Sequence, residues 1–174
     1  MVSMTRRRVL VTGAAGFIGY HVSKHLHYQG DSVFGIDNFN DYYDPLLKRK
    51  RAELLKLLNI SIVDGDIQHT GVIQNLLKNE QITHVIHLAA QAGVRYSITH
   101  PEAYLRTNID GFLQVLEAIR KYPEIPLVYA SSSSVYGLNK KVPFSIDDTT
   151  DSQANFYGVT KKTNELMAAT YHYL

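Results

Sequence analysis

Three side chains in the second half of the sequence could carry out acid–base chemistry together. Tyr157 and Lys161 stand four residues apart in Tyr-Gly-Val-Thr-Lys, and Ser132 lies 25 residues before Tyr157. Positions four apart share one face of a helix, so the Lys161 ammonium would stabilise a Tyr157 phenolate. A tyrosine hydroxyl ordinarily ionises near about pH 10, and this stabilisation would make it a base near neutral pH. Because the spacing is common on helices, a purely structural pair is the alternative.

A glycine-rich turn near the N-terminus predicts a phosphate-binding site. The apolar run Val9–Val11 predicts a buried strand, and it leads into Gly13, Gly16 and Gly19 and then into a helical pattern. Glycine lets the backbone approach a pyrophosphate closely, and the N-terminus of a helix favours the anion. Three spaced glycines alone are weak evidence for a phosphate-binding turn, so the interpretation depends on the next strand.

The second predicted strand, Ser32–Ile36, leads directly into Asp37. Dinucleotide-binding folds place a carboxylate at this point to bind the 2′-hydroxyl of a ribose. Asp37 therefore favours NAD over NADP, because a 2′-phosphate would meet a negative charge. The alternative is that Asp37 merely starts a turn with Asn38.

The rest of the sequence alternates strand and helix patterns, which is typical of a Rossmann-like, doubly wound parallel α/β sheet. We predict strands at residues 60–63, 83–88 and 126–130, and an irregular loop near the site at 137–155. A long helix is predicted from Pro101 to about Tyr122. Its sheet-facing side chains are predicted to be Leu105, Ile109, Phe112, Leu116 and Ile119.

Composition excludes several classes of function. The chain has 174 residues, of which 45% are hydrophobic, and this length suits one domain. The absence of cysteine excludes disulfides and thiol catalysis, and a net charge of +2 is too small to favour nucleic acid. The basic run Lys48–Arg51 is predicted to form the solvated face of a helix. No stretch approaches the ~20 apolar residues of a membrane span, so we expect a cytoplasmic protein.

The histidines do not predict a metal site. His21 and His25 stand four apart on the first predicted helix, but no carboxylate follows at a recognised metal-ligand spacing. His84 and His87 are an odd number of residues apart on a strand, which sends them to opposite faces of the sheet.

Together these motifs resemble the N-terminal part of an extended short-chain dehydrogenase/reductase of the nucleotide-sugar epimerase and dehydratase group. The matching motifs follow the family's order along nearly the whole chain. They are Thr12–Gly19, Gly65-Asp66-Ile67, His87-Leu-Ala-Ala90, Asn108, Ser132 with Val135-Tyr-Gly137, and Tyr157 with Lys161. Three further segments, Asp37–Asp44, Gln91–Ser97 and Lys161–Ala168, are more similar to UDP-glucuronate 4-epimerases than to UDP-galactose 4-epimerases.

The resemblance implies a domain organisation and a set of contacts. Members of the group continue well beyond residue 174, so residues 1–174 are expected to be an NAD-binding domain whose C-terminal substrate domain is absent. Asp66 and Ile67 are expected beside the adenine. The full set of implied NAD contacts is Gly13, Gly16, Phe17, Ile18, Gly19, Asp37, Asn38, Asp66, Ile67, Leu88, Ala89, Ala90, Asn108, Tyr157 and Lys161.

The resemblance also implies a mechanism, epimerisation of a UDP-sugar at carbon 4. Tyr157, as phenolate, would take the proton of the C4 hydroxyl while the C4 hydride passes to NAD, and Ser132 would bind that oxygen. The 4-keto sugar would then turn over and accept the hydride on its other face. Arg95 and Ser133 are expected to contact the substrate, although a solvated loop arginine is an equal alternative for Arg95.

Two other functions stay open. Dehydratases and decarboxylases of the group usually carry an acidic residue just before Val-Tyr-Gly, where this chain has Ser133 and Ser134, so epimerisation is preferred. Without a C-terminal region, the chain could also be a catalytically inactive NAD-binding module. The family resemblance further implies a homodimer of the full-length protein, with the helix from Pro101 as a candidate interface.

Overall fold

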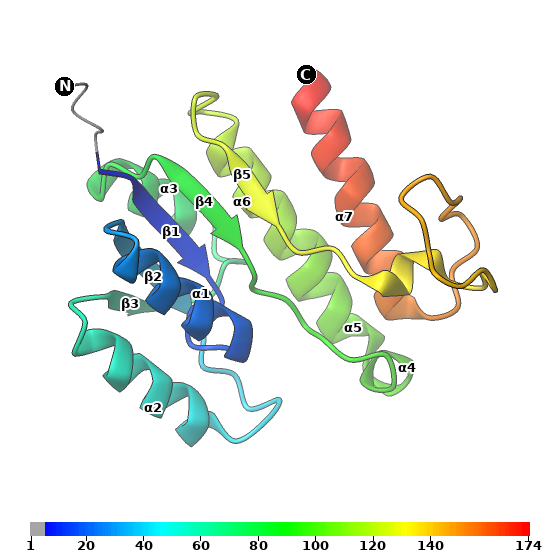
Figure 1. Ribbon diagram of the computed structural model, residues 1–174, viewed down its shortest axis with the longest axis horizontal. Helices are drawn as coiled ribbons and strands as arrows, with labels where there is room; N and C mark the ends of the chain where they lie inside the picture. The colour runs from blue at the N-terminus through cyan, green and yellow to red at the C-terminus, as the bar shows by residue number, and fades with distance from the viewer. Residues whose placement is uncertain (1–5) are drawn as a thin grey trace.

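The computed structural model describes residues 6–174 and shows a parallel sheet between two layers of helices (Figure 1). The strands are β1 (Arg8–Thr12), β2 (Ser32–Asp37), β3 (Ser61–Asp64), β4 (His84–His87) and β5 (Leu127–Tyr129). They are all parallel and are ordered β3-β2-β1-β4-β5. The order reverses between β1 and β4, which confirms the predicted doubly wound sheet and locates its ligand crevice beyond the carboxyl ends of these strands.

Helices cover both faces of this sheet (Figure 1). On one face lie α1 (Phe17–Tyr28) and α2 (Pro45–Lys56), and on the other lie α3 (Val72–Asn79) and α6 (Gly111–Ile119). Helix α7 (Phe156–Tyr173) packs beside α6, and the short helices α4 (Tyr96–Thr99) and α5 (Pro101–Tyr104) lie near its first turn. The start of α7 is thereby held close to the carboxyl end of the sheet.

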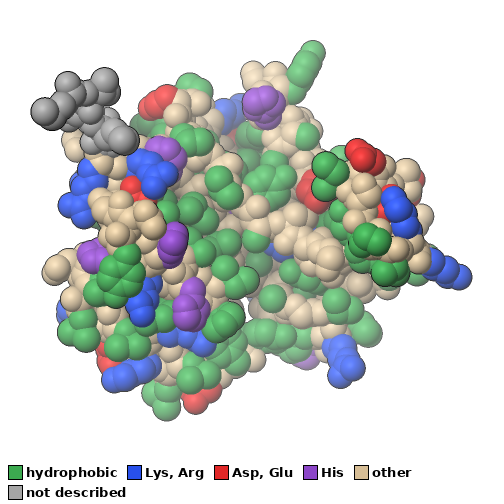
Figure 2. Space-filling model, in the orientation of Figure 1, with side chains coloured by type: hydrophobic (Ala, Val, Ile, Leu, Met, Phe, Trp, Pro, Cys, Tyr) green, Lys and Arg blue, Asp and Glu red, His purple; other side chains and the backbone are tan. Residues whose placement is uncertain are grey.

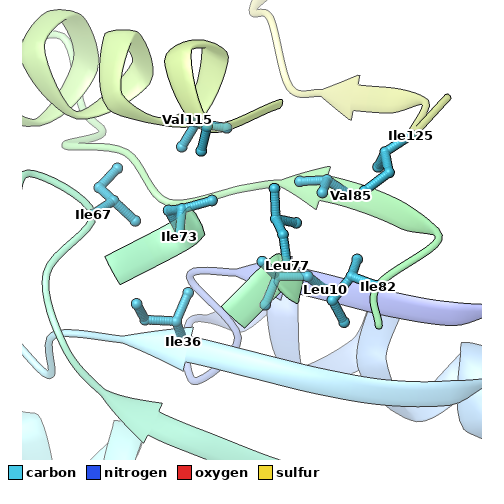
Figure 3. Close-up of a cluster of buried hydrophobic side chains, with 10 residues drawn as sticks. Leu10, Ile36, Ile67, Ile73, Leu77, Ile82, Val85, Val115 and Ile125 are labelled. Carbon is cyan, nitrogen blue, oxygen red and sulfur yellow. The ribbon is translucent and has the colours of Figure 1, made fainter. Parts of the chain in front are cut away.

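The core follows from the alternation of side chains along the strands. Leu10 of β1 and Val85 of β4 point to the same face, where they pack with Ile73 and Leu77 of α3 and Val115 of α6 (Figure 3). On the opposite face the buried cluster consists of Val9, Val11, Ala14, Val33, Leu55 and Ile60. Strand β1 is buried on both faces, which explains its continuous apolar run. Each fully buried aliphatic side chain contributes about 1.5–3 kcal/mol of hydrophobic stabilisation.

The predicted long helix from Pro101 is interrupted by a π-helical segment, η1 (Leu105–Asp110), between α5 and α6. The backbone N–H of Gly111 donates to the carbonyl of Arg106, five residues back. This extra residue rotates the buried face, so that Tyr104 and Asn108 point inward. The prediction that Leu105 faces the sheet is wrong, because this side chain is 48% exposed.

The predicted irregular loop at residues 137–155 is confirmed, since the segment forms no helix or strand. Its carboxylate Asp148 accepts hydrogen bonds from the side chains of Asn139 and Lys141 and from the backbone N–H of Ser145. These bonds lower the pKa of Asp148 below its ordinary value and keep the loop folded on itself.

Charged side chains of both signs are scattered over the surface shown in Figure 2, where they alternate with hydrophobic ones. This mixture agrees with the small net charge of the sequence. Across residues 6–174, none of the helices has the length and apolar character that crossing a bilayer requires.

Candidate functional site

A cavity of about 320 Å³ opens at the carboxyl ends of β1 and β4. Twelve of the fifteen predicted NAD contacts line it. They are Gly13, Gly16, Phe17, Ile18, Gly19, Asp37, Asn38, Asp66, Ile67, Leu88, Ala89 and Ala90. The other three, Asn108, Tyr157 and Lys161, are outside its lining. The structure therefore gathers segments from both halves of the sheet at the expected switch point.

At two positions of the glycine turn there is no room for a side chain. Gly13 has φ +67°, and a Cβ there would lie 2.8 Å from the backbone nitrogen of Ala89. A Cβ on Gly19 would lie 2.0 Å from the carbonyl oxygen of Gly13, so the third glycine lets α1 start directly against the turn. The first turn of α1 consequently faces the cavity with its free N–H groups, an arrangement that favours an anion.

Asp37 ends β2 at the cavity wall and is almost fully buried. Its Oδ2 accepts from the backbone N–H of Ala15 at 3.0 Å, and its Oδ1 accepts from that of Phe39 at 2.9 Å. The Lys48 ammonium lies 3.7 Å from Oδ1. The carboxylate is thus more than the start of a turn, because it is held by two backbone donors and a cation.

Lys48 corrects the prediction of a fully solvated basic face on α2. Its side chain is buried in the cavity wall, and Nζ donates to Asn40 Oδ1 at 2.5 Å. Burial lowers the pKa of Lys48, an effect that the charge of Asp37 partly offsets. The neighbouring Arg49 and Lys50 are exposed as predicted.

Asp66 and Asn38 form the next part of the wall. Asn38 Nδ2 donates to Asp66 Oδ2 at 2.8 Å, and Asp66 Oδ1 accepts from the backbone N–H of Gln68 at 2.9 Å. Ile67 is buried beside them and supplies an apolar surface. Together they offer the polar edge and the apolar face that a planar base requires.

Thr12 joins the two strands that flank the cavity. Its hydroxyl oxygen accepts from the backbone N–H groups of Leu88 and Ala89, both at 3.1 Å, and lies 2.8 Å from His87 Nδ1. With both lone pairs occupied, the hydroxyl must donate its proton to Nδ1, so the His87 ring is neutral. Burial lowers the pKa of His87 to about 3, with a smaller contribution from Lys161, and keeps it in this state.

Lys161 lies on the buried side of α7, and its Nζ donates to the carbonyl of Ala130 at 2.9 Å. Ala130 directly follows β5, and Ser132 is two residues further along, so this bond ties α7 to the serine segment. Burial lowers the pKa of Lys161 to about 8. The ammonium is therefore the main form at neutral pH and is lost just above it.

Tyr157 lies in the first turn of α7, where Asn155 Oδ1 accepts from the backbone N–H of Gly158 at 2.8 Å and caps the helix. A Cβ on Gly158 would lie 2.7 Å from the carbonyl oxygen of Ser134, so glycine allows the close approach of α7 to the 3₁₀-helix η2 (Ser133–Tyr136). The Tyr157 ring is half-buried and meets Tyr104 edge-on, with centroids 6.0 Å apart.

The segments that carry the three predicted catalytic side chains pack against one another. Ser132 Oγ accepts from the backbone N–H of Ser134 at 3.2 Å and begins η2, against which the first turn of α7 packs. Among the described residues, no hydrogen bond links the Tyr157 hydroxyl to Lys161 or Ser132. Tyr157 and Lys161 lie four residues apart on α7, but the Lys161 ammonium binds the backbone carbonyl of Ala130 and not the Tyr157 hydroxyl.

The buried Asn108 side chain makes hydrogen bonds to two other segments. Its side chain accepts from the backbone N–H of Gln91 at 2.8 Å and donates to the Gln91 carbonyl and to Thr160 Oγ1, each at 3.0 Å. Asn164 in turn donates to the Asn108 carbonyl. The Asn108 amide therefore joins the loop after β4 to α7, and its contact with NAD stays a prediction.

Arg95 and Ser133, the two predicted substrate contacts besides Ser132, are exposed. Arg95 precedes α4 and Ser133 opens η2, so both lie on the carboxyl side of the sheet but outside the cavity lining. Their contact with a sugar stays a prediction.

Sequence reasoning missed several cavity residues, notably Tyr42, Tyr43, Lys48 and Gln91. The two tyrosines follow β2 in an irregular segment, where periodicity gives no information. Gln91 is buried near the Tyr104 hydroxyl, and its Nε2 makes no hydrogen bond of good geometry within residues 6–174. Burial raises the pKa of Tyr104 to about 12, and its hydroxyl donates to the carbonyls of Ala92 and Gly93.

Known proteins are similar to this chain in both sequence and fold. The family model described as GDP-mannose 4,6 dehydratase matches residues 10–174. UDP-glucuronate 4-epimerase 4 of Arabidopsis thaliana is 54% identical over 167 residues, which is 95% of this chain and 38% of that protein. UDP-glucuronic acid 4-epimerase of Bacillus cereus, solved with UDP-glucuronic acid and NAD, is 36% identical with a TM-score of 0.85. That match covers 95% of this chain and 52% of the other.

A further solved relative is UDP-glucose 4-epimerase of Brucella ovis in complex with NAD, which is 31% identical with a TM-score of 0.81. The match covers 95% of this chain and 47% of the other, so the chain spans about half or less of the length of these relatives. Because the family model covers nearly every described residue, the chain belongs to the GDP-mannose 4,6 dehydratase family of nucleotide-sugar epimerases and dehydratases.

Proposed function

We propose that this chain is the cofactor-binding and catalytic part of an NAD-dependent UDP-glucuronate 4-epimerase. The proposal rests on one observation: the cavity and the contact between β5 and α7 lie at the same end of the sheet. A dinucleotide-type cavity has Asp37 and Leu88 in its wall. The carbonyl of His87, the residue before Leu88, accepts from the N–H of Ala130, and the carbonyl of Ala130 accepts from Lys161. The identity of 54% to an Arabidopsis epimerase and the likeness to the Bacillus cereus enzyme with UDP-glucuronic acid support the choice of substrate.

The residues of the cavity fit NAD. Gly13 and Gly16 line the cavity beside the N-terminus of α1, whose free N–H groups would bind a pyrophosphate. Asp37 is positioned at the end of β2, where its carboxylate would accept from a ribose hydroxyl. The buried Gln91 Nε2, which makes no hydrogen bond of good geometry within residues 6–174, would gain an acceptor from a bound ligand. The chemistry supplied by bound NAD is reversible hydride transfer at carbon 4 of the sugar.

Each candidate catalytic side chain has a role that its surroundings support. Tyr157 would take the proton from the C4 hydroxyl and return it after the sugar has turned over. Lys161, cationic at neutral pH, would favour the phenolate through its charge, and the Ala130 carbonyl keeps the ammonium in place. Ser132 would bind the C4 oxygen from the start of η2.

The alternative reactions of the group need a further proton donor or acceptor at the substrate. In this chain Ser133 and Ser134 occupy the positions before Val135-Tyr-Gly137, and a hydroxyl is a poor acid or base unless it is activated. We therefore favour epimerisation over dehydration or decarboxylation. An NAD-binding module without activity is the remaining candidate, because the chain spans only part of its relatives.

The test uses the complete polypeptide that carries this sequence. Incubation with NAD and UDP-glucuronate should yield UDP-galacturonate, and Tyr157→Phe should lower kcat by about 10²–10⁴ while NAD stays bound. Tyr173→Phe, at an exposed tyrosine near the end of α7, is the matched control. Release of carbon dioxide would indicate a decarboxylase, and NAD binding without turnover would indicate the module.

Three properties of the whole protein belong to the same proposal. Residues 1–174 would form the NAD-binding domain, and a C-terminal substrate domain would add substrate contacts to those of Arg95, Ser132 and Ser133. A homodimer is expected from the family resemblance and a cytoplasmic location from the lack of a long apolar stretch in the sequence, and both stay predictions.

A further inference from the structure

The first turn of α7 is held by a residue from a distant part of the chain. The first N–H groups of any helix have no partner within that helix. Asn155 Oδ1 accepts from the N–H of Gly158. Within residues 6–174, the N–H of Tyr157 finds its acceptor in Ser97 Oγ, at 3.3 Å. These two residues are 60 positions apart, so Ser97 is a second cap of α7 that is supplied by the short helix α4.

The Ser97 hydroxyl is oriented for this contact. The residue is 1% exposed, and its hydroxyl donates a hydrogen bond to the carbonyl of Val94 at 2.7 Å. Because the only proton of the hydroxyl is used in this bond, the oxygen presents its lone pairs to the N–H of Tyr157. Alanine at position 97 would leave that N–H without this acceptor.

Tyr104 holds both Tyr157 and the loop that leads to Ser97. Tyr104 is fully buried, and its hydroxyl donates to the carbonyls of Ala92 and Gly93. Its ring meets the ring of Tyr157 edge-on, with centroids 6.0 Å apart. Tyr157 is therefore contacted at two points, at its backbone by Ser97 and at its ring by Tyr104.

Resting on the proposed function, we infer that Ser97 is a positioning residue for the reaction. It fixes the backbone of Tyr157 at the start of α7 and thereby the place of the hydroxyl that takes the C4 proton. A misplacement of about 1 Å at the reacting atoms can cost about 10²-fold in rate. The loss of one hydrogen bond behind Tyr157 should therefore be visible in kcat.

The first experiment measures kinetics in the complete polypeptide. Ser97→Ala should lower kcat about tenfold. The KM for UDP-glucuronate and the affinity for NAD should change by less than about threefold, because Tyr104 still holds the loop that carries Arg95. The matched control is Thr99→Ala, at an exposed hydroxyl on the same short helix, which should keep the parent's kcat.

A double-mutant cycle separates positioning from a general loss of structure. In a Tyr157→Phe background, Ser97→Ala should change the remaining rate by less than about twofold, because the hydroxyl that Ser97 positions is no longer present. An equal loss of rate in both backgrounds would show that Ser97 does not act through Tyr157, and this outcome overturns the inference.

The second experiment needs no turnover. Amide hydrogen exchange is followed by NMR in protein with isotope-labelled tyrosine and glycine. In Ser97→Ala the N–H of Tyr157 should exchange about tenfold faster, whereas that of Gly158, which Asn155 caps, should keep the parent's rate. Unchanged exchange at Tyr157 contradicts the inference.

Two further outcomes have a defined meaning. Should Ser97→Ala fail to fold, Ser97→Cys takes its place, because sulfur is a weak acceptor and should speed the exchange at Tyr157 about threefold. A parent without epimerase activity would overturn the proposed function, while the exchange at Tyr157 would still decide whether Ser97 holds its backbone. The two failures are therefore distinguishable.

Discussion

At the scale of single residues, Lys161 should give the reaction a characteristic pH dependence. Burial lowers the pKa of its ammonium to about 8 from the ordinary 10.5, so the cation is present below about pH 8 and lost above it. If the cation supports the Tyr157 phenolate, kcat/KM should fall as the pH rises through about 8. The measurement is a pH profile of kcat/KM with UDP-glucuronate.

The neighbouring lysine provides the control for this profile. Lys161→Met should be slow at every pH and should lack the alkaline decline, whereas Lys162→Met should keep it, because Lys162 pairs with Glu165 on the accessible side of α7. A parent profile that stays flat up to about pH 10 would contradict the assigned role of the ammonium.

At the scale of elements, Thr12 connects β1 to the loop that follows β4. Thr12→Val would leave the backbone N–H of Ala89 and the ring of His87 without their shared partner, whereas the N–H of Leu88 keeps the backbone carbonyl of Thr12. Each unsatisfied buried group costs about 1–3 kcal/mol, so we expect a loss of roughly 2–4 kcal/mol in the free energy of unfolding. Thr12→Ser keeps the hydroxyl and should lose far less. Urea unfolding of both variants tests this, and equal stabilities would refute the bridging role.

Asn108 should matter through the elements that it joins. Asn108→Ala removes its bonds to Gln91 and Thr160, so we expect a loss of about 2–4 kcal/mol in the free energy of unfolding. Turnover should fall as well, because α7 is no longer tied to the loop after β4. Asn79→Ala, at an exposed position that ends α3, is the control. Thermal unfolding and assay of both variants separate this role from a direct contact, which would weaken NAD and leave stability intact.

The sequence predicts the strands well, but it does not predict the π-helical segment η1. Strand β1 and the glycine turn are local signals, since an apolar run and three spaced glycines need no knowledge of the rest of the fold. The π-helical segment adds one residue to a turn, and a count of 3.6 residues per turn assigns Leu105 to the wrong face. The inward orientation of Tyr104, which ends α5, and of Asn108 in η1 is explained only by partners outside this helix.

Lys48 shows that the burial of a charged residue is equally hard to predict from the sequence. Within a run of four basic residues, a solvated face is the natural expectation, because an unpaired buried ammonium is costly. The cost is offset here by Asp37 and Asn40, which reach Lys48 only after β2 and α2 have packed together. Candidate site residues that depend on one strand end or one turn are thus predictable, whereas those that depend on pairing between elements are not.

At the scale of the whole molecule, His87 couples folding to pH. Its ring is buried between the sheet and Phe112, it is neutral, and its pKa is lowered to about 3 from 6.5. Between about pH 3 and 6.5 the unfolded chain therefore binds a proton at this site that the folded chain does not. Stability rises with pH wherever the unfolded state binds more protons, so His87 destabilises the fold progressively as the pH falls below about 6.5.

The expected result is a loss of stability on the order of 4 kcal/mol from His87 alone between about pH 6.5 and 3, which is the size of its pKa shift expressed as free energy. His87→Gln removes the titrating group and should flatten this part of the curve, even if the variant is less stable at pH 7. His84→Gln, at the partly exposed histidine that begins β4, should keep the parent's slope. Urea unfolding of the three proteins across this pH range provides the measurement. If the His87→Gln curve ran parallel to that of the parent, the acid sensitivity would have to arise elsewhere, and the ring could not be the buried neutral acceptor of the Thr12 hydroxyl.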